Sequence, residues 1–182
     1  MLEYETAARA KGYQYVAGVD EAGRGPLAGP VVAAAVLLVS ESYFNGINDS
    51  KKLSSQAREK FFLIIKKQAL SYGIGIVDVE KIDKINILQA SLLAMKHAVE
   101  GLSRKPNLLL IDGNQKIETA IKQLTIIKGD SLSQSIAAAS IMAKVTRDKI
   151  MERYHEKFPR YAFNKHKGYG TRLHRDLIRK YG

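Results

Sequence analysis

Acidic side chains follow several of the apolar segments in this chain, and they are the residues best suited to catalysis. Three short apolar segments lead into carboxylates, which are Asp20 with Glu21, Asp112, and Asp130. Carboxylates at the ends of buried strands lie on the edge of a sheet, where open α/β folds usually bind their ligands. Several like charges on one edge repel one another unless a multivalent cation lies among them. The four acids therefore predict a metal site.

The ligand types indicate which ion would bind there. A site made only of oxygen ligands favours Mg²⁺ or Mn²⁺, hard ions that keep bound water and also accept phosphate oxygens. Two such ions about 4 Å apart can activate a water molecule and stabilise the leaving oxygen of a displacement at phosphorus. The chain has no cysteine, and its four histidines do not form an i, i+4 pair on one expected helix, so a zinc site is not indicated.

Two of the acids also have purely structural interpretations. The sequence Asp112-Gly113-Asn114 is typical of a turn. Asp130, with two serines shortly after it, is typical of the N-cap of a helix. Each alternative remains open for its own residue, and the metal site rests on the convergence of all four acids.

A Gly-Arg-Gly segment, residues 23–25, directly follows the first acidic pair. Glycine allows a backbone to approach a substrate closely, and an arginine can bind a phosphate. The same segment is also typical of an ordinary turn between two strands. From composition and spacing alone, both interpretations stay open.

Length and charge indicate the class of protein and of partner. The 182 residues, 46% of them hydrophobic, suffice for one domain that buries roughly 70% of the surface of its unfolded chain. The formal net charge is +11, which favours an anionic partner such as nucleic acid. Residues 141–182 contain 12 Lys and Arg against 4 Asp and Glu, so +8 of this charge lies there. Aromatic residues are interspersed among these cations, which suits contacts with phosphates and sugars, although a solvated helix would have a similar composition.

The expected elements form an α/β architecture. Apolar runs bounded by turn residues predict five strands, at residues 15–19, 31–39, 72–79, 107–111 and 124–127. Three helices are expected at residues 55–71, 87–102 with Asn86 as the cap, and about 133–157. The first strands follow one another through a loop, whereas the later strands alternate with helices. We therefore expect a mixed sheet of antiparallel and parallel strands, flanked by helices.

The composition also bears on the location of the protein. The first 15 residues contain acids where a signal peptide has an apolar run, and no stretch of 18 apolar residues occurs. The absence of cysteine excludes disulfides and a thiolate nucleophile and agrees with a reducing compartment. We expect a soluble cytoplasmic protein without membrane contact, and a monomer.

Six motifs occur in order along the chain. They are GVDEAGRGPLAGPV at 18–31, DSKKLS at 49–54, INILQA at 85–90, DG at 112–113, KGDS at 128–131 and HKGYGT at 166–171. Together they closely resemble the ribonuclease HII family, and the resemblance runs from about Gly18 to His174. The first motif alone is fairly specific, and all six in order leave little room for coincidence.

The resemblance implies a ribonuclease H-like fold and a metal-dependent endonuclease. Such an enzyme cuts the RNA strand of RNA–DNA hybrids and nicks 5′ of ribonucleotides embedded in duplex DNA, leaving 3′-hydroxyl and 5′-phosphate ends. The metal ligands of the family fall on the four acids named above, which would hold two Mg²⁺ or Mn²⁺ ions. Its ribonucleotide contacts fall on Gly23, Arg24 and Gly25, and its junction-sensing tyrosine falls on Tyr169.

Basic residues complete the expected substrate surface. Lys51, Lys52, Lys144 and Arg147, with the region 165–180, are expected to neutralise backbone phosphates. Residues 1–182 are expected to form one catalytic domain whose basic segment, about 141–182, contributes to substrate binding. The chain ends soon after the Tyr169 motif, so contacts from the longer C-terminal tails of some members are not expected.

Two other classes of protein compete with this interpretation. Ribonuclease HIII, a related enzyme with the same fold, usually has an extra N-terminal module, whereas only about 17 residues precede the Asp20 strand end here. A non-catalytic nucleic-acid-binding module would need neither four carboxylates nor a Gly-Arg-Gly loop. A titration with divalent ions would separate that module from an enzyme.

Overall fold

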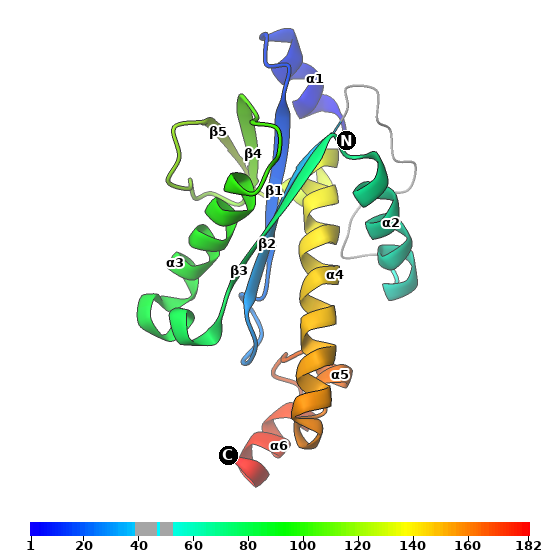
Figure 1. Ribbon diagram of the computed structural model, residues 1–182, viewed down its shortest axis with the longest axis vertical. Coiled ribbons are helices and arrows are strands. Elements are labelled where there is room, and N and C mark those ends of the chain that lie inside the picture. Colours follow the sequence, from blue (N-terminus) through cyan, green and yellow to red (C-terminus); the bar gives the residue numbers. More distant parts are fainter. Residues whose placement is uncertain (39–46, 48–52) are drawn as a thin grey trace.

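A five-stranded sheet forms the centre of the molecule in the computed structural model, which describes residues 1–38, 47 and 53–182 (Figure 1). Its strands are β1 (Val16–Ala22), β2 (Val31–Leu37), β3 (Ser71–Val77), β4 (Leu108–Asp112) and β5 (Lys122–Ile126), in the order β3-β2-β1-β4-β5. β1 and β3 pair antiparallel with β2, while β4 pairs parallel with both β1 and β5. The mixed five-stranded sheet expected from the sequence is confirmed.

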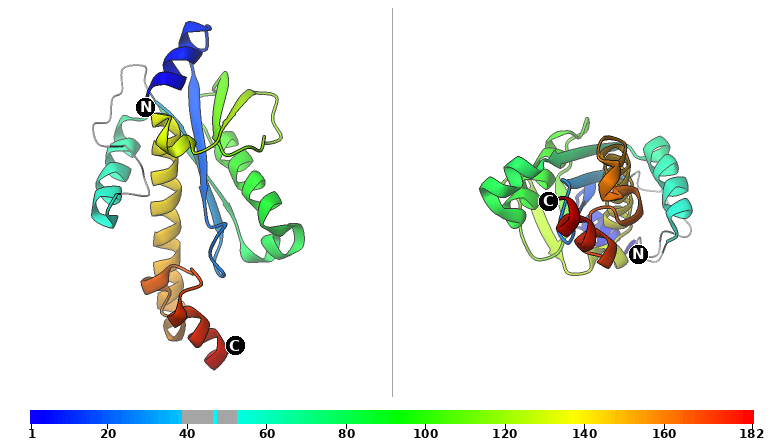
Figure 2. Two further views of the ribbon diagram at one scale, coloured as in Figure 1. Left: turned by 180° about the vertical axis from the view of Figure 1, so that it is seen from behind. Right: turned by 90° about the horizontal axis from the view of Figure 1, so that it is seen from below.

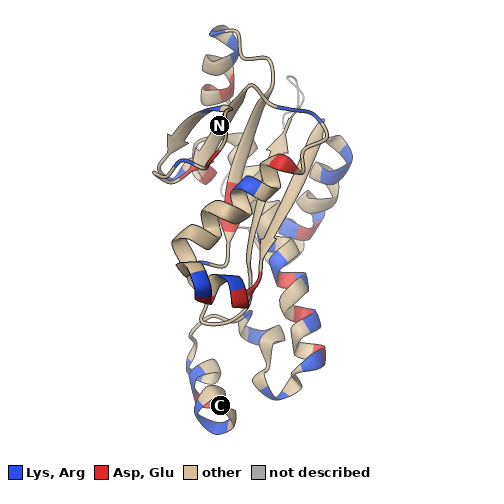
Figure 3. Ribbon diagram, turned by 60° about the vertical axis from the view of Figure 1, so that its left-hand side comes forward, with Lys and Arg blue, Asp and Glu red and all other residues tan. Residues whose placement is uncertain are grey.

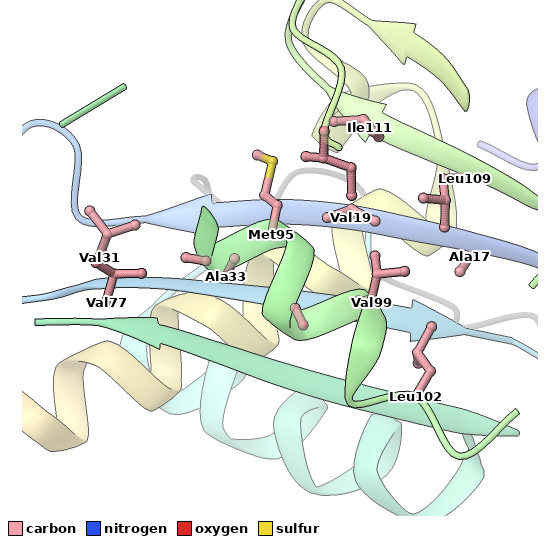
Figure 4. Close-up of a cluster of buried hydrophobic side chains, with 14 of the residues drawn as sticks. Ala17, Val19, Val31, Ala33, Val77, Met95, Val99, Leu102, Leu109 and Ile111 are labelled. Atoms are coloured by element: carbon pink, nitrogen blue, oxygen red, sulfur yellow. The ribbon is translucent and has the colours of Figure 1, made fainter. Parts of the chain in front are cut away.

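Helices cover both faces of this sheet. α3 (Val79–Glu100) packs on one face, and α4 (Gln134–Lys157) packs on the other, with α2 (Ser55–Gln68) beside it (Figure 2). Every residue of β2 is buried, because this strand lies between two others and under helices on both sides. The cluster beneath α3 is drawn in Figure 4, where Met95 and Val99 of the helix meet Val19 and Ile111 of the sheet.

Small residues allow α4 to lie close to β1. A Cβ atom at Gly18 would stand 2.1 Å from the carbonyl carbon of Ser135, so a larger residue would push the helix off the strand. The α4 segment 137–139 consists of alanines that are fully buried. This close contact places the side chains of α4 next to the end of β1 that carries the first acids.

The helix boundaries differ from the expected ones for local reasons. α3 starts at Val79, earlier than expected, because Asp78 caps a first helical segment through the Lys81 N–H. Asn86 has φ of 68° inside α3, and its Oδ1 accepts the N–H groups of Leu88 and Gln89. The predicted Asn86 cap is therefore confirmed, as the cap of the second segment of a kinked helix.

The two ends of the chain add helices that the periodicity did not predict individually. α1 (Glu3–Ala10) is held against α4 by Glu5, whose buried carboxylate accepts hydrogen bonds from Ser133 and Ser135. The short 3-10 helix η1 (Gly129–Ser131) precedes α4. Beyond α4 follow a second 3-10 helix, η2 (Pro159–Tyr161), and then α5 (Phe163–His166) and α6 (Arg172–Tyr181). Figure 1 shows α5 beside the C-terminal end of α4, with α6 lying beyond that end.

Candidate active site

Three of the four predicted metal ligands lie around one cleft of about 370 Å³. Asp20 and Glu21 end β1 and Asp112 ends β4; because these strands are parallel neighbours, their C-terminal ends meet at one edge of the sheet. Asp20 is 5% exposed, and its Oδ1 accepts the Glu21 N–H at 2.7 Å. The sequence argument about strand ends therefore placed these three acids correctly.

The electrostatics of the cleft disfavour its negative charges. Burial raises the pKa of Asp20 well above its ordinary value, and the charges of Glu21 and Asp112 raise it further. Burial likewise raises the pKa of Glu21, although the nearby Arg24 guanidinium, 3.3 Å from Oε1, acts in the opposite direction. A hydrogen bond with Ser140 also favours ionised Asp20 without outweighing burial. Burial is therefore the main reason that the ionised forms of Asp20 and Glu21 are disfavoured.

Asp130 lies beside this cleft instead of lining it. It belongs to η1, is 3% exposed, and is not among the described residues that line the cleft. The adjacent Gly129 N–H donates to Asp112 Oδ1 at 2.6 Å, which ties η1 to the end of β4. Asp130 is not the cap of α4, because Ser133 occupies that position and accepts the Ile136 N–H.

The donor types in the cleft fit a hard divalent cation. Carboxylate oxygens are the ligands that Mg²⁺ and Mn²⁺ prefer, and the mutual repulsion of the three acids is what a cation would relieve. Within the described residues, however, no group of three or more carboxylate or histidine side chains stands close enough together to hold a metal ion. The acids thus share a cleft without forming a closed set of ligands.

The Gly-Arg-Gly loop forms another wall of the cleft. Gly23, Arg24 and Gly25 all line it, directly after the acids of β1. Gly23 has φ of +120°, and a Cβ there would stand 2.5 Å from the Pro30 carbonyl oxygen. At Gly25 a Cβ would meet only Tyr169 Cε1, at 3.7 Å, an ordinary contact. The loop is therefore a turn that needs glycine at residue 23 and that leaves open space toward the cleft at residue 25.

Tyr169 lines the cleft beside this loop and is 42% exposed. Lys144 Nζ lies 5.3 Å from the centre of the Tyr169 ring and 2.7 Å from Asp148 Oδ1, so this lysine is oriented from two sides. Tyr169 and Gly25, which the resemblance named separately, thus come together at one cleft although they are far apart in sequence. Their contacts with a substrate remain predictions.

Two lining residues were not singled out from the sequence, namely Arg58 on α2 and Ser140 on α4. Ser140 precedes Lys144 by four residues, which places both on one face of α4. That spacing, within the alanine-rich start of the expected helix, was the available signal for Ser140. No sequence signal pointed to Arg58, because only the packing of α2 on α4 brings it to the cleft.

The expected phosphate contact of Arg147 needs correction. This side chain is 1% exposed, and its three guanidinium nitrogens donate to the backbone carbonyl oxygens of Ala28, Pro30 and Lys167. A guanidinium buried among carbonyl groups cannot meet a phosphate in solvent. Two of the lysines expected to bind phosphate, Lys51 and Lys52, lie outside the described residues.

Many basic residues of the C-terminal region lie on two helices, α4 and α6. Figure 3 shows Lys and Arg along α4 and on α6. On α6, the Arg172 side chain is 94% exposed and that of Arg179 is 78% exposed, each near Asp176. Exposed pairs of this kind contribute little to stability, so these arginines remain available to an anionic partner.

Histidine plays a packing role in the same region, as its spacing suggested. His166 and His174 stack with ring centres 4.2 Å apart, and both are buried. Burial is the main cause that lowers the pKa of His166 below its ordinary value.

Within the described ranges, no helix combines the length and the apolar character needed to cross a bilayer.

Comparisons with known proteins agree with this fold. The family model of ribonuclease HII matches residues 17–182. A ribonuclease HII from Syntrophus aciditrophicus is 56% identical over 182 residues, which cover all of this chain and 86% of that relative. The ribonuclease H2 from Pyrococcus horikoshii superimposes with a TM-score of 0.79 at 26% identity, covering 92% of this chain and 86% of that one. Bst-RNase HIII in complex with Mn²⁺ shares the fold at 21% identity and a TM-score of 0.69, with 94% and 67% of the two chains covered.

Proposed function

The chain belongs to the ribonuclease HII family, whose members are ribonuclease H enzymes, and we propose that it is a metal-dependent endonuclease acting on RNA within RNA–DNA duplexes. It hydrolyses the RNA strand of hybrids and nicks 5′ of ribonucleotides embedded in duplex DNA, leaving 3′-hydroxyl and 5′-phosphate ends. The observation that carries this proposal is one cleft lined by three carboxylates, the Gly-Arg-Gly loop and Tyr169.

In this proposal Asp20, Glu21, Asp112 and Asp130 hold two Mg²⁺ or Mn²⁺ ions. When bound, such ions supply charge stabilisation at phosphorus and lower the pKa of a coordinated water. Burial raises the pKa of both Asp20 and Glu21, and the nearby Asp112 charge raises each further, which supports this assignment because a bound cation would stabilise the ionised carboxylates.

The remaining residues of the cleft bind and orient the nucleic acid. The backbone of Gly23 and Gly25 approaches the 2′-hydroxyl, which is the group that distinguishes RNA from DNA. Arg24 is half exposed and contacts phosphate, and the Tyr169 ring packs against the sugar that follows the ribonucleotide. Lys144 lies beside that ring and contributes positive charge to the same strand.

We further propose that residues 1–182 act as one catalytic domain and that the basic segment 141–182 contributes to substrate binding. The long helix α4 supports this, because it packs on β1 and β2 at one end and against α5 at the other. The exposed arginines of α6 would extend the contact along the duplex backbone.

The direct test is a cleavage assay on two end-labelled substrates, a DNA duplex carrying one ribonucleotide and a continuous RNA–DNA hybrid. The wild-type protein should cut both with Mg²⁺ or Mn²⁺ and neither in chelator, and the product should be extendable by a polymerase from its 3′-hydroxyl. An all-DNA duplex is the substrate control. Binding of these duplexes without cleavage in either ion would favour the non-catalytic module.

A further inference from the structure

Arg147 connects two segments of the cleft that are far apart in sequence. Its Nε and Nη2 atoms donate to the carbonyl oxygens of Pro30 and Ala28 at 3.0 and 2.9 Å, in the loop that continues from Gly25. Its Nη1 atom donates to the Lys167 carbonyl oxygen at 2.8 Å, two residues before Tyr169. One buried side chain of α4 thus binds both segments at once.

The same two segments also contact each other directly. The Leu27 N–H donates to the Gly168 carbonyl oxygen at 2.8 Å. Gly168 has φ of +87°, and a Cβ there would stand 2.2 Å from the Ala28 carbonyl oxygen. The backbones are therefore in close contact at a point that only glycine permits, immediately next to the Arg147 guanidinium.

Tyr169 is held firmly within its own segment. Its N–H donates to the His166 carbonyl oxygen at 2.9 Å, and its carbonyl oxygen accepts a hydrogen bond from His174 Nδ1 at 3.0 Å. The two histidines stack on each other and on Phe163 at their edges. Because this segment is internally rigid, a link to it sets the position of the Tyr169 ring as a whole.

The chemistry of the guanidinium suits this link. Arginine presents five N–H donors in a planar fork, whereas the lysine ammonium has three donors on a single nitrogen atom. Carbonyl oxygens that point in three directions can be satisfied together by the fork. A buried cation whose partners are incompletely bound is costly, so the arrangement is stable only while all three carbonyls stay in place.

We propose that Arg147 is a positioning residue that fixes the Gly-Arg-Gly loop relative to Tyr169, so that both contact the substrate in one arrangement. This inference rests on the proposed function, since it assumes that both segments contact the substrate. Arg147 acts by binding the carbonyl oxygens of the loop and of Lys167, and it does not contact the substrate itself.

A first experiment measures amide hydrogen exchange in the protein without substrate, and so does not depend on the enzymatic activity. Arg147→Lys should accelerate exchange of the Leu27 amide by about tenfold or more, as expected when one hydrogen-bonded support is lost, while amides of the β1–β2 ladder change little. Met95→Ala, a cavity variant under the opposite face of the sheet, is the matched control and should not single out Leu27. Equal acceleration at Leu27 and in the ladder for Arg147→Lys would show a general loss of stability and overturn the proposal.

A second experiment measures kcat and KM on the single-ribonucleotide duplex, at a temperature where every variant is folded. Arg147→Lys should lower kcat/KM by about a hundredfold, because misplacing a substrate by ~1 Å can cost that much. Met95→Ala should stay near wild type. If wild-type protein cuts neither substrate, the proposed function is wrong. The hydrogen-exchange measurement at Leu27 then still tests whether Arg147 holds the two segments together. If wild type cuts and Arg147→Lys cuts equally well, the positioning role is wrong.

A variant on the loop side covers the case in which Arg147→Lys does not fold. Leu27→Pro removes the N–H that binds Gly168, and the Leu27 side chain itself is 61% exposed. Loss of this one hydrogen bond should lower kcat/KM about tenfold with little change in melting temperature. Unchanged cleavage by a folded Leu27→Pro protein would contradict the coupling of the two segments.

Discussion

The acidic edge and the loop clamp, two walls of the same cleft, are built in opposite ways. The acidic edge comprises Asp20, Glu21 and Asp112, and the loop clamp comprises residues 23–30 and 166–169 around Arg147. At the acidic edge, burial and like charges raise the pKa of the first two acids. In the loop clamp, each guanidinium nitrogen donates to a carbonyl oxygen. The first region needs a ligand to complete it, whereas the second is complete without one.

This difference follows from the chemistry of the groups. Ionised carboxylates only accept hydrogen bonds, so acids placed together need donors or cations from elsewhere. The guanidinium only donates, and backbone carbonyls that turn toward it satisfy it locally. We infer that a cation would stabilise the ionised carboxylates of the acidic edge, whereas the clamp is preorganised for the substrate before any cation binds.

The largest expected effect comes from removing one charge at the acidic edge. Asp20→Asn, or Asp130→Asn in the adjacent 3-10 helix, should reduce cleavage on the order of 10³-fold, because charge stabilisation at phosphorus depends on the ligands that hold the ions. Folding and hybrid binding should persist, since neither substitution changes side-chain volume. Rates on the single-ribonucleotide duplex, together with a binding measurement, check this expectation.

Glu118→Gln is the matched control for a lost carboxylate. Glu118 is exposed, pairs with Lys96 and lies on the α3 side of the molecule, in a groove separate from the cleft. Its removal should leave cleavage at the wild-type level. If Asp20→Asn retained normal specific activity in its folded fraction, the assignment of Asp20 as a metal ligand would be wrong.

The acidic edge was largely predictable from sequence, for a simple physical reason. An apolar run that ends in an acid predicts a strand and places the acid at one edge of the sheet. Parallel pairing of β1 with β4 then brings Asp20 and Asp112 together. Asp130 was harder to place, because Lys128 takes φ of 58° and redirects the chain into η1 after β5. The distance of Asp130 from the cleft depends on that turn, which no periodicity encodes.

The loop clamp was predictable only through resemblance, and one of its residues was misinterpreted. The motifs pointed to Gly25 and Tyr169 but gave no reason for them to meet across one cleft. The sequence predicts a phosphate contact for Arg147, because a basic residue on an expected helix is usually exposed. Its burial arises from tertiary contacts with residues 28, 30 and 167, which lie 20 or more positions away.

The next largest effect is expected at the aromatic side of the clamp. Tyr169→Ala should reduce cleavage of the single-ribonucleotide duplex by about ten- to a hundredfold, the range expected for the loss of one stacking contact. Tyr169→Phe should be mild if packing dominates and severe if the phenol donates a hydrogen bond. Rates on both the single-ribonucleotide duplex and the continuous hybrid decide the matter. Wild-type rates on both substrates for Tyr169→Ala would remove this residue from junction sensing.

Substitution of the two loop glycines should show which of them is needed for the fold and which for substrate binding. Gly25→Ala places a methyl group 3.7 Å from Tyr169, so the melting temperature should change little while KM rises about tenfold through obstruction of the substrate. Gly23→Ala is strained by its φ of +120° and by the Pro30 carbonyl, so it should lower the melting temperature as well. Thermal unfolding and steady-state kinetics on both variants test this. Equal loss of stability in both would contradict the open space at Gly25.

A smaller effect is expected outside both regions, on α6. Binding should weaken steeply with salt, because each phosphate contact releases a counterion. Replacing Arg172 and Arg175 together by glutamine should reduce the slope of log affinity against log salt by about 2, since each lost contact contributes roughly 0.9. The measurement is a salt titration of hybrid binding in the presence of Ca²⁺. An unchanged slope would place the basic footprint elsewhere, for instance on Lys144.

The smallest expected effect concerns stability, and it tests the contrast between the two regions most directly. The pKa of Asp20 is raised in the folded protein, so its protonated form stabilises the fold below the unfolded pKa of about 3.9, and this contribution is lost as pH rises through the folded pKa. At neutral pH in chelator, Asp20→Asn should therefore melt higher than wild type, by roughly 2–4 °C for each kcal/mol of repulsion removed. The difference should shrink as the solution is acidified, because wild-type Asp20 then becomes neutral too.

Millimolar Mg²⁺ or Mn²⁺ should reverse this order, because a cation that binds only the folded protein raises its melting temperature and should bind the intact acidic edge more tightly. Arg147→Lys is the control from the loop clamp: it should leave the cation-induced shift near that of wild type, since the hydrogen bonds of Arg147 are to carbonyl groups and not to the acids. Equal cation-induced shifts in wild type and Asp20→Asn would show that Asp20 takes no part in a shared cation site. If Arg147→Lys also lost the cation-induced rise in melting temperature, the loop clamp and the acidic edge would depend on each other. The clamp would then not be complete without a cation.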